Sequence, residues 1–430
     1  MKAFKLPSDF LMGSATAGAQ IEGGITKSNW YKWCIDGHIK DGSTCIRAND
    51  HWNRYSEDIG WMKILNQQVY RMSVEWSRIE PRKGEFDQDA IFHYRDEITE
   101  LIRNGIRPLV TLHHFSHPLW LVEEGEFENE KVVELFERYV TYVVSNLGDL
   151  VSEYITINEP NVYGVLGYYF GEWPPGKKDI KLVMKVFRNM VLCHIRAYQA
   201  IHRIRQQSRF SGETKVGIAN ALRVFHPLSA RNPFNILAAR IMDYLFQEAL
   251  VLSMADGKLR FPIGKGAPLG TGKYYDFIGI NYYTRSAVQC KGFRSTFFTQ
   301  NPRNDLGWEI YPDGLSQICK RYYEKLKAPI WITENGTCDK KDAFRARFIY
   351  DHLYEVSRLC SEGIPVQRYY HWTLMDNFEW AEGESAPFGL IRVNFETQQR
   401  TLQRSGSFYA EVCREKGVTD NMIRKYFGST

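Results

Sequence analysis

The chain has 430 residues, of which 44% are hydrophobic and 24% are charged, as in ordinary globular proteins. These values exclude a fibrous or globally disordered chain, and the length allows a large buried core without disulfide bonds. The 55 basic and 50 acidic residues are intermixed and leave a net charge of +5, so the sequence predicts a mixed solvated surface and no nucleic-acid partner.

Short runs rich in β-branched residues alternate with longer helical patterns, and no linker or change of composition separates them. The predicted strands are Phe10–Gly18, Gln68–Trp76, Ile106–Phe115, Glu153–Glu159, Lys215–Ala221, Phe277–Thr284, Pro329–Glu334 and Val366–Asp376. The predicted helices are His51–Leu65, Gln88–Asn104, Glu128–Leu147, Ile180–Gln206, Asn235–Ala255, Gly314–Lys327, Asp342–Glu362 and Leu402–Lys416. This alternation predicts an α/β fold, a (β/α)8 TIM barrel in which residues 1–430 form a single domain.

Polar or aromatic residues follow the apolar part of most predicted strands. They are Ala19-Gln20, Glu75-Trp76, His113-His114, Asn158-Glu159, Asn281-Tyr282-Tyr283, Glu334-Asn335 and Asp376-Asn377. The ends of barrel strands meet at the face that carries the active site. An open doubly wound sheet would instead place its site at one switch point, so these many polar ends favour a closed barrel.

The sequence predicts neither a secretory signal nor a membrane span. The first residues, Met1–Pro7, include no apolar signal core, and no apolar stretch approaches the ~18 residues that a bilayer requires. The 8 cysteines are scattered and include no CxxC pair, which is typical of reduced thiols in a cytoplasmic protein. The sequence leaves homo-oligomerisation open.

Two glutamates have nearly matched surroundings. Glu159 ends the run Tyr154–Glu159 and precedes Pro160, while Glu334 ends the run Ile330–Glu334. Each alone reads as a surface residue just past a strand. As a pair at the mouth of one barrel they predict glycoside hydrolysis, in which one carboxyl group donates a proton and the other attacks or activates water.

Four separate motifs extend this interpretation. They are Phe10–Ala17 with Gln20–Gly23, Thr156–Pro160, Ile332–Gly336 and Asp376–Trp380. In this order they resemble the signature segments of the family 1 glycoside hydrolases of β-glucosidase type, and the resemblance covers nearly the whole chain. It implies a retaining exo-β-glycosidase that acts by double displacement on terminal β-D-glucosyl residues of oligosaccharides or of aryl and alkyl glycosides. Galactosyl and fucosyl residues remain alternatives.

The resemblance also implies roles for individual residues. Glu159 matches the general acid/base and Glu334 the nucleophile, while Arg71 and Tyr283 match the residues that support the nucleophile. Substrate-binding positions are matched by Gln20, His114, Asn158, Asn281, Tyr283, Trp308, Trp372, Glu379 and Trp380. With 14% aromatic residues, the chain has more rings than a core requires, and flat apolar faces suit sugars. An arginine beside Glu334 is expected to lower the pKa of that carboxyl group.

Neither a metal nor another cofactor is expected. His113 and His114 are adjacent in a predicted strand, so they point to opposite faces and cannot easily share a metal. No metal or nucleotide-binding motif is present. Ala19, Phe115, Asn161 and Thr337 depart from the pattern of the resemblance. None of these changes removes a catalytic group, but Phe115 and Asn161 leave the aglycone preference open.

Three other functions remain as alternatives. A 6-phospho-β-glycosidase is disfavoured because Glu382–Leu390 contains two glutamates and no lysine, and because Glu379 would repel a phosphate. A non-catalytic sugar-binding barrel is disfavoured because both carboxylates are present. A mainly transglycosylating enzyme would use the same residues and is not distinguished by the sequence.

Overall fold

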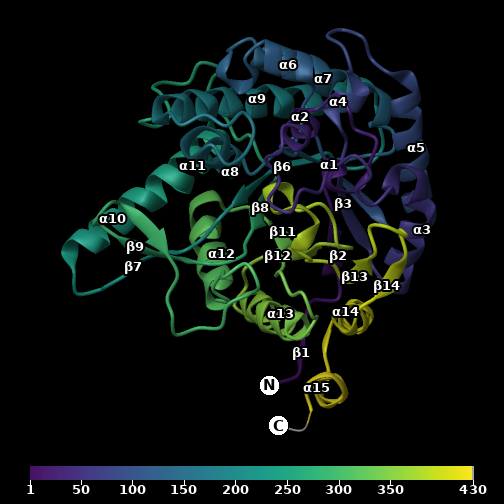
Figure 1. Ribbon diagram of the computed structural model, residues 1–430, viewed down its shortest axis with the longest axis vertical. Coiled ribbons are helices and arrows are strands. Elements are labelled where there is room, and N and C mark those ends of the chain that lie inside the picture. The colour runs from purple at the N-terminus through teal and green to yellow at the C-terminus, as the bar shows by residue number, and fades with distance from the viewer. Residues whose placement is uncertain (429–430) are drawn as a thin grey trace.

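Eight parallel strands form a closed barrel in the computed structural model, which describes residues 1–428 (Figure 1). In order around the barrel they are β2 (Leu11–Ala15), β3 (Val69–Ser73), β4 (Arg107–Thr111), β5 (Glu153–Asn158), β6 (Lys215–Ala221), β8 (Phe277–Asn281), β11 (Ile330–Asn335) and β12 (Val366–Trp372). The barrel closes where β12 pairs with β2, with Trp372 opposite Ala15. The predicted (β/α)8 barrel is therefore confirmed.

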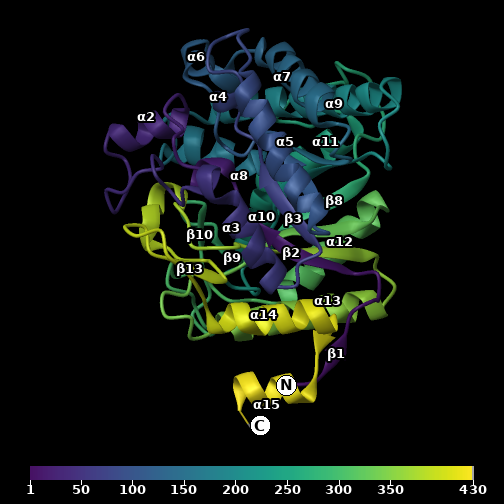
Figure 2. The same ribbon diagram turned by 90° about the vertical axis from the view of Figure 1, so that its right-hand side faces the viewer.

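Helices cover the outside of the barrel. The long ones are α3 (His51–Ile64), α5 (Gln88–Arg103), α7 (Val132–Leu147), α9 (Ile180–Gln207), α12 (Asp313–Leu326), α13 (Arg345–Ser361) and α14 (Arg404–Glu415). In α7 the buried residues Val132, Phe136, Val140 and Val143 recur at helical spacing and form its apolar face. Helices α7 and α9 pack side by side at one end of the molecule (Figure 1, Figure 2).

Most predicted strands are longer than the observed ones. The prediction Phe10–Gly18 is wrong beyond Ala15, and Gln20 lies in the short helix α1 (Gly18–Ile21). Strand β4 ends at Thr111, and Phe115 has a φ of 66°, a left-handed conformation that a strand cannot contain. The chain turns into loops at this face, which is why the polar residues converge over the barrel mouth.

One predicted helix is interrupted. The segment predicted as Asn235–Ala255 forms α10 (Pro233–Asp243), a π-helical stretch at Tyr244–Glu248, and α11 (Ala249–Asp256). Asn232 ends the loop before α10, and its Oδ1 accepts a hydrogen bond from the backbone N–H of Phe234 at 2.9 Å. Helix propensity and apolar spacing do not distinguish an α-helix from one with a single π-helical turn.

Short elements complete the fold. They are β1 (Phe4–Lys5), α2 (Asn29–Ile35), α4 (Trp76–Ile79), α6 (Leu119–Glu123), α8 (Pro160–Val165), β7 (Phe225–Pro227), β9 (Ser286–Gln289), β10 (Arg294–Thr296), β13 (Ile391–Val393), β14 (Arg400–Leu402), β15 (Gly417–Val418) and α15 (Asp420–Phe427), with 3-10 turns at Glu126–Glu128 and Trp380–Ser385 and a π-helical turn at Leu166–Phe170. Strand β1 pairs with β15, so the first residues lie beside α15 (Figure 2). Within residues 1–428, no helix combines the length and apolarity needed to cross a membrane.

Candidate active site

A cavity of about 570 Å³ opens at the carboxyl ends of the barrel strands. This volume lies within the ~300–1,000 Å³ typical of ligand sites. Both Glu159 and Glu334 line it. The other predicted site residues in its wall are His114, Tyr283, Trp308, Trp372, Glu379 and Trp380. The remaining ones, Gln20, Arg71, Asn158 and Asn281, are fully buried and hydrogen-bonded to members of this wall.

Glu334 receives two hydrogen bonds, one on each carboxylate oxygen. Its Oε1 lies 2.6 Å from Nη1 of Arg71, and its Oε2 accepts a hydrogen bond of 2.5 Å from the Tyr283 hydroxyl. Burial raises the pKa of Glu334, while the Arg71 guanidinium and the Tyr283 hydroxyl act in the opposite direction. Arg71 therefore lowers the pKa of Glu334, as expected, but burial raises this pKa by a larger amount.

Glu159 has a different environment. It follows β5 with a φ of 41°, and its backbone N–H donates to the carbonyl of Ala219 at 2.7 Å. Its Oε1 accepts a 2.9 Å hydrogen bond from Nδ2 of Asn281. Burial, followed by the charge of Glu334, raises the pKa of Glu159 to about 8. Two nearby carboxylates do not readily ionise together, so we expect the pair to hold one proton, on Glu159, and the negative charge to lie on Glu334.

A buried polar network positions both glutamates. Nη2 of Arg71 donates to Oδ1 of Asn158 at 2.6 Å, and the same oxygen accepts from Asn281 at 3.0 Å. Nδ2 of Asn158 lies 3.0 Å from Nε2 of His114, and the Thr333 hydroxyl donates to Oδ1 of Asn281 at 2.6 Å. The network joins β3, β5, β8 and β11, so the geometry of the site is fixed by the barrel itself.

Two polar groups in and beside the cavity wall have unused hydrogen-bonding capacity. Nε2 of Gln20 donates to Oε2 of Glu379 at 3.1 Å, but its buried Oε1 has no partner among residues 1–428. Nδ1 of His114 also has none within this described range. Burial raises the pKa of Glu379 to about 8, and the hydrogen bond from Gln20 opposes this rise. Buried polar atoms usually find partners, so this arrangement suits a ligand with many hydroxyl groups.

Aromatic rings surround these polar groups. The rings of Trp372 and Trp380 lie 5.8 and 5.9 Å from the ring of His114, both nearly parallel to it. Trp308 lies edge-on to Tyr283 with 5.9 Å between ring centroids. The cavity therefore combines apolar walls with hydrogen-bonding groups, as a carbohydrate site requires.

His113 and His114 occupy opposite sides of the chain, as predicted. His114 lines the cavity, whereas His113 lies outside it, with its Nε2 3.4 Å from Nδ1 of His117. Nε2 of His117 is 3.2 Å from Oε2 of Glu126, so these histidines belong to a buried cluster behind β4. Across residues 1–428, the side chains of His, Cys, Asp and Glu form no group of three or more that could hold a metal ion.

Sequence reasoning missed part of the cavity wall. The additional lining residues include Trp33, His38, Lys40, Val162, Leu166, Glu172, Trp173, Ala221, Arg223, Phe297, Leu306, Phe388 and Glu382. The high aromatic content was the one signal for such a wall. Asn161, one of the departures from the family pattern, instead donates from Nδ2 to the carbonyl of Ala221 at 2.7 Å and ties α8 to β6.

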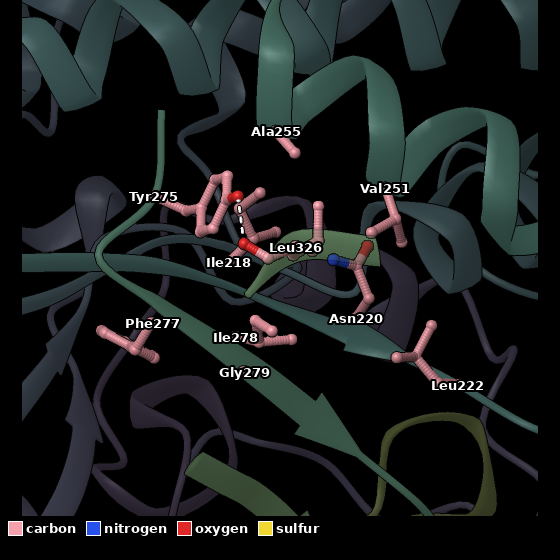
Figure 3. Close-up of a pocket in the computed structure, with 10 residues that line it drawn as sticks. All are labelled: Ile218, Asn220, Leu222, Val251, Ala255, Tyr275, Phe277, Ile278, Gly279 and Leu326. Carbon is pink, nitrogen blue, oxygen red and sulfur yellow. Dashed lines mark hydrogen bonds between the residues drawn. The ribbon is translucent and has the colours of Figure 1, made fainter. Parts of the chain in front are cut away.

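A second hollow lies outside the barrel, between β6, β8 and α11 (Figure 3). Its volume is about 20 Å³, and the hydroxyl of Tyr275 donates across it to the carbonyl of Leu326 at 2.7 Å. This space accommodates about one water molecule, so it is too small for a sugar. The cavity at the barrel mouth contains both Glu159 and Glu334, so carbohydrate chemistry is assigned there.

Comparison with known proteins agrees with this geometry. The sequence profile of Glycosyl hydrolase family 1 matches residues 2–418. Beta-glucosidase A of Thermotoga maritima is 32% identical over 98% of this chain and 100% of its own length, and the 1,4-beta-D-glucan glucohydrolase of Thermotoga neapolitana is 32% identical over 97% and 100%. The structure of a beta-glycosidase from Pyrococcus horikoshii has a TM-score of 0.91 at 34% identity and covers 100% of this chain and 99% of that one. The chain therefore belongs to glycosyl hydrolase family 1, as its motifs predicted, and is a glycoside hydrolase.

Proposed function

We propose that the protein is a retaining β-glucosidase in which Glu334 is the nucleophile and Glu159 the general acid/base. The observation that carries this assignment is the unequal hydrogen bonding of the two carboxyl groups. Glu334 accepts hydrogen bonds from Arg71 and Tyr283, which stabilise its negative charge. Glu159 accepts only one, from the Asn281 amide, and keeps the shared proton. A nucleophile must be ionised and a proton donor must be protonated.

The reaction proceeds in two displacements. Glu334 attacks the anomeric carbon while Glu159 transfers its proton to the glycosidic oxygen, so the C–O bond to the aglycone breaks and the alcohol leaves neutral. Water then donates a proton to Glu159 and attacks the same carbon, which releases the sugar and regenerates both carboxyl groups. Two inversions at one carbon give overall retention of the β configuration.

The sugar is held by polar groups in and beside the cavity that contains the carboxylate pair. Gln20 and His114 supply unused hydrogen-bonding atoms for its hydroxyl groups, Glu379 supplies a carboxyl group, and Trp372 and Trp380 cover its apolar face. Asn158 lies beside Glu334 and Arg71, where its amide can contact the hydroxyl next to the anomeric carbon. Hydrogen bonds at that hydroxyl strengthen in the transition state.

A glucosyl substrate is favoured by the naming of the Thermotoga relatives, with galactosyl and fucosyl as alternatives. A 6-phosphoglycoside is disfavoured because Glu379 in the cavity wall offers a phosphate no positive charge, and because Lys40 is already paired with Glu382. Transglycosylation uses the same groups, with an alcohol in place of water. A single catalytic domain over residues 1–430, a cytoplasmic location and homo-oligomerisation stay predictions.

The test is hydrolysis of para-nitrophenyl β-D-glucoside by purified protein without added metal or nucleotide, followed by proton NMR. We expect the first-formed glucose to be the β anomer and the rate to be unchanged by EDTA. An α anomer would contradict the retaining assignment, and an EDTA-sensitive rate restored by a divalent ion would contradict a mechanism carried by two carboxyl groups alone.

A further inference from the structure

Arg223 stands at the wall of the active-site cavity, two residues past the end of β6. Ala221 and Arg223 line this cavity, whereas Leu222 between them points into the outer hollow (Figure 3). The backbone N–H of Arg223 donates to Oε1 of Gln247 at 3.0 Å, and Nε2 of Gln247 donates to the carbonyl of Arg223 at 2.9 Å. This double contact fixes the direction in which the Arg223 side chain leaves the backbone.

The guanidinium of Arg223 lacks a protein acceptor. Within residues 1–428 it makes no ion pair and no side-chain hydrogen bond, and its nearest described aromatic contact is the ring of Phe246 at 5.1 Å. Arg223 is half-buried at the cavity wall. The more deeply buried Arg345 and Arg400 are paired with Asp342 at 2.9 Å and with Asp58 at 3.0 Å. Burial lowers the pKa of Arg223, and the charge of Glu159 opposes this effect.

Arg223 lies close enough to the proton donor Glu159 to bear on the leaving group. Its charge acts on Glu159, the proton donor, and Glu159 must contact the oxygen that links the sugar to the aglycone. Gln20 and Glu379, the groups assigned to the sugar, are hydrogen-bonded to each other. Within residues 1–428 neither is hydrogen-bonded to Arg223, so we assign Arg223 to the aglycone beside the proton donor. Of the other charged wall residues, Lys40 is paired with Glu382, and Glu172 is exposed to solvent at the rim.

We propose that Arg223 forms an anion-binding aglycone subsite, so that the enzyme favours β-glucosides whose aglycone carries a carboxylate or another anionic oxygen group. This inference rests on the proposed function. The planar fork of a guanidinium matches two oxygens of such a group, and the pairing is strongest away from water. Glu159 carries the shared proton when substrate binds, so it does not repel the anion.

The test compares para-carboxyphenyl β-D-glucoside with its uncharged carboxamide analogue in the wild type and in Arg223→Met. The measured quantity is kcat/KM for the carboxylate divided by kcat/KM for the carboxamide. This ratio cancels effects that are common to both substrates. We expect this ratio to fall at least ~10-fold in Arg223→Met, as for the loss of a charge-assisted hydrogen bond, and to recover partly in Arg223→Lys. A para-sulfophenyl glucoside distinguishes a carboxylate-specific site from a general anion site.

Lys40→Met is the matched control, because Lys40 lines the same cavity but already has Glu382 as its partner. Its ratio should equal that of the wild type. Equal ratios in the wild type and Arg223→Met would overturn the proposal, as would a change of the ratio in Lys40→Met alone. The proposal would also be overturned if the alkaline limb of the pH profile moved in Arg223→Met while the ratio stayed the same. Arg223 would then act only on the pKa of Glu159.

Binding gives a readout that does not depend on turnover. The corresponding 1-thio-β-D-glucosides resist hydrolysis, so their dissociation constants can be measured by calorimetry even if the proposed β-glucosidase activity is absent. We expect the carboxylate to bind more tightly than the carboxamide in the wild type and this preference to disappear in Arg223→Met. A preference that persists in the variant would contradict the subsite, whatever the activity measurements show.

Discussion

Arg71 on β3 and Glu334 on β11 form a buried ion pair of 2.6 Å across the barrel interior. The same guanidinium also holds Asn158 and the carbonyl of Thr333, so it fixes the position of the nucleophile as well as its charge. Because these elements are barrel strands, the contact is part of the core of the fold. Stability and catalysis therefore depend on the same side chain.

Replacement of Arg71 by methionine should reduce kcat/KM on para-nitrophenyl β-D-glucoside at least ~10-fold at neutral pH, the effect of one charge-assisted hydrogen bond. The guanidinium lowers the pKa of Glu334, so its loss raises that pKa and moves the acidic limb of the pH profile to higher pH. Arg71→Lys should restore part of both effects. If the acidic limb lay at the same pH in the wild type and in Arg71→Met, with folding verified by circular dichroism, this role would be contradicted.

The sequence predicted local features of the site better than its contacts. Glu159 and Glu334 each end a strand-like run followed by a chain breaker, and this pattern can be read within a few residues. The barrel could be predicted because its alternation repeats along the whole chain. The contact of Arg71 with Glu334 could be named only through the family resemblance, because the two are 263 positions apart.

Other features could not be predicted, for physical reasons. Strand ends were placed too late because Phe115 and Glu159 adopt positive φ, which depends on tertiary contacts more than on residue type. Arg223 was missed because no local pattern shows that an arginine forms no ion pair; this is visible only in the contacts of the folded chain over residues 1–428. The net effect of burial on Glu334 likewise requires the folded surroundings.

The adjacent residues His114 and His113 offer a matched pair of variants. His114 lines the cavity, so His114→Phe should remove a sugar contact and lower kcat/KM ~10-fold or more while the ring volume is kept. His113 packs against Phe127 with 4.9 Å between ring centroids, outside the cavity. His113→Phe should leave kcat/KM unchanged and alter only thermal stability. Similar kinetic losses in both variants would show that the effect of His114 is structural.

The proton on Glu159 predicts the alkaline side of the pH profile. Burial and the charge of Glu334 raise the pKa of Glu159 to about 8, and only its protonated form can donate to the leaving oxygen. Activity on para-nitrophenyl β-D-glucoside should therefore fall as pH rises through about 8, the pKa of that group. In Glu159→Gln the residual activity on an activated aryl glucoside should lack this limb. An alkaline limb at the same pH in the variant would assign it to another group, such as Glu379.

The two glutamates can finally be distinguished by which step each variant loses. Glu334→Ala cannot form the covalent intermediate, so all substrates should be affected alike, and azide in the vacated space should attack the anomeric carbon directly to give the α-glycosyl azide. Glu159→Ala lacks only the proton donor. Dinitrophenolate leaves without proton assistance, so glycosylation should survive for dinitrophenyl β-D-glucoside but not for an alkyl glucoside. Azide should then attack the intermediate without a general base and give the β-azide. Proton NMR of the azide products measures the outcome, and the α-azide from Glu159→Ala together with the β-azide from Glu334→Ala would reverse the two assignments.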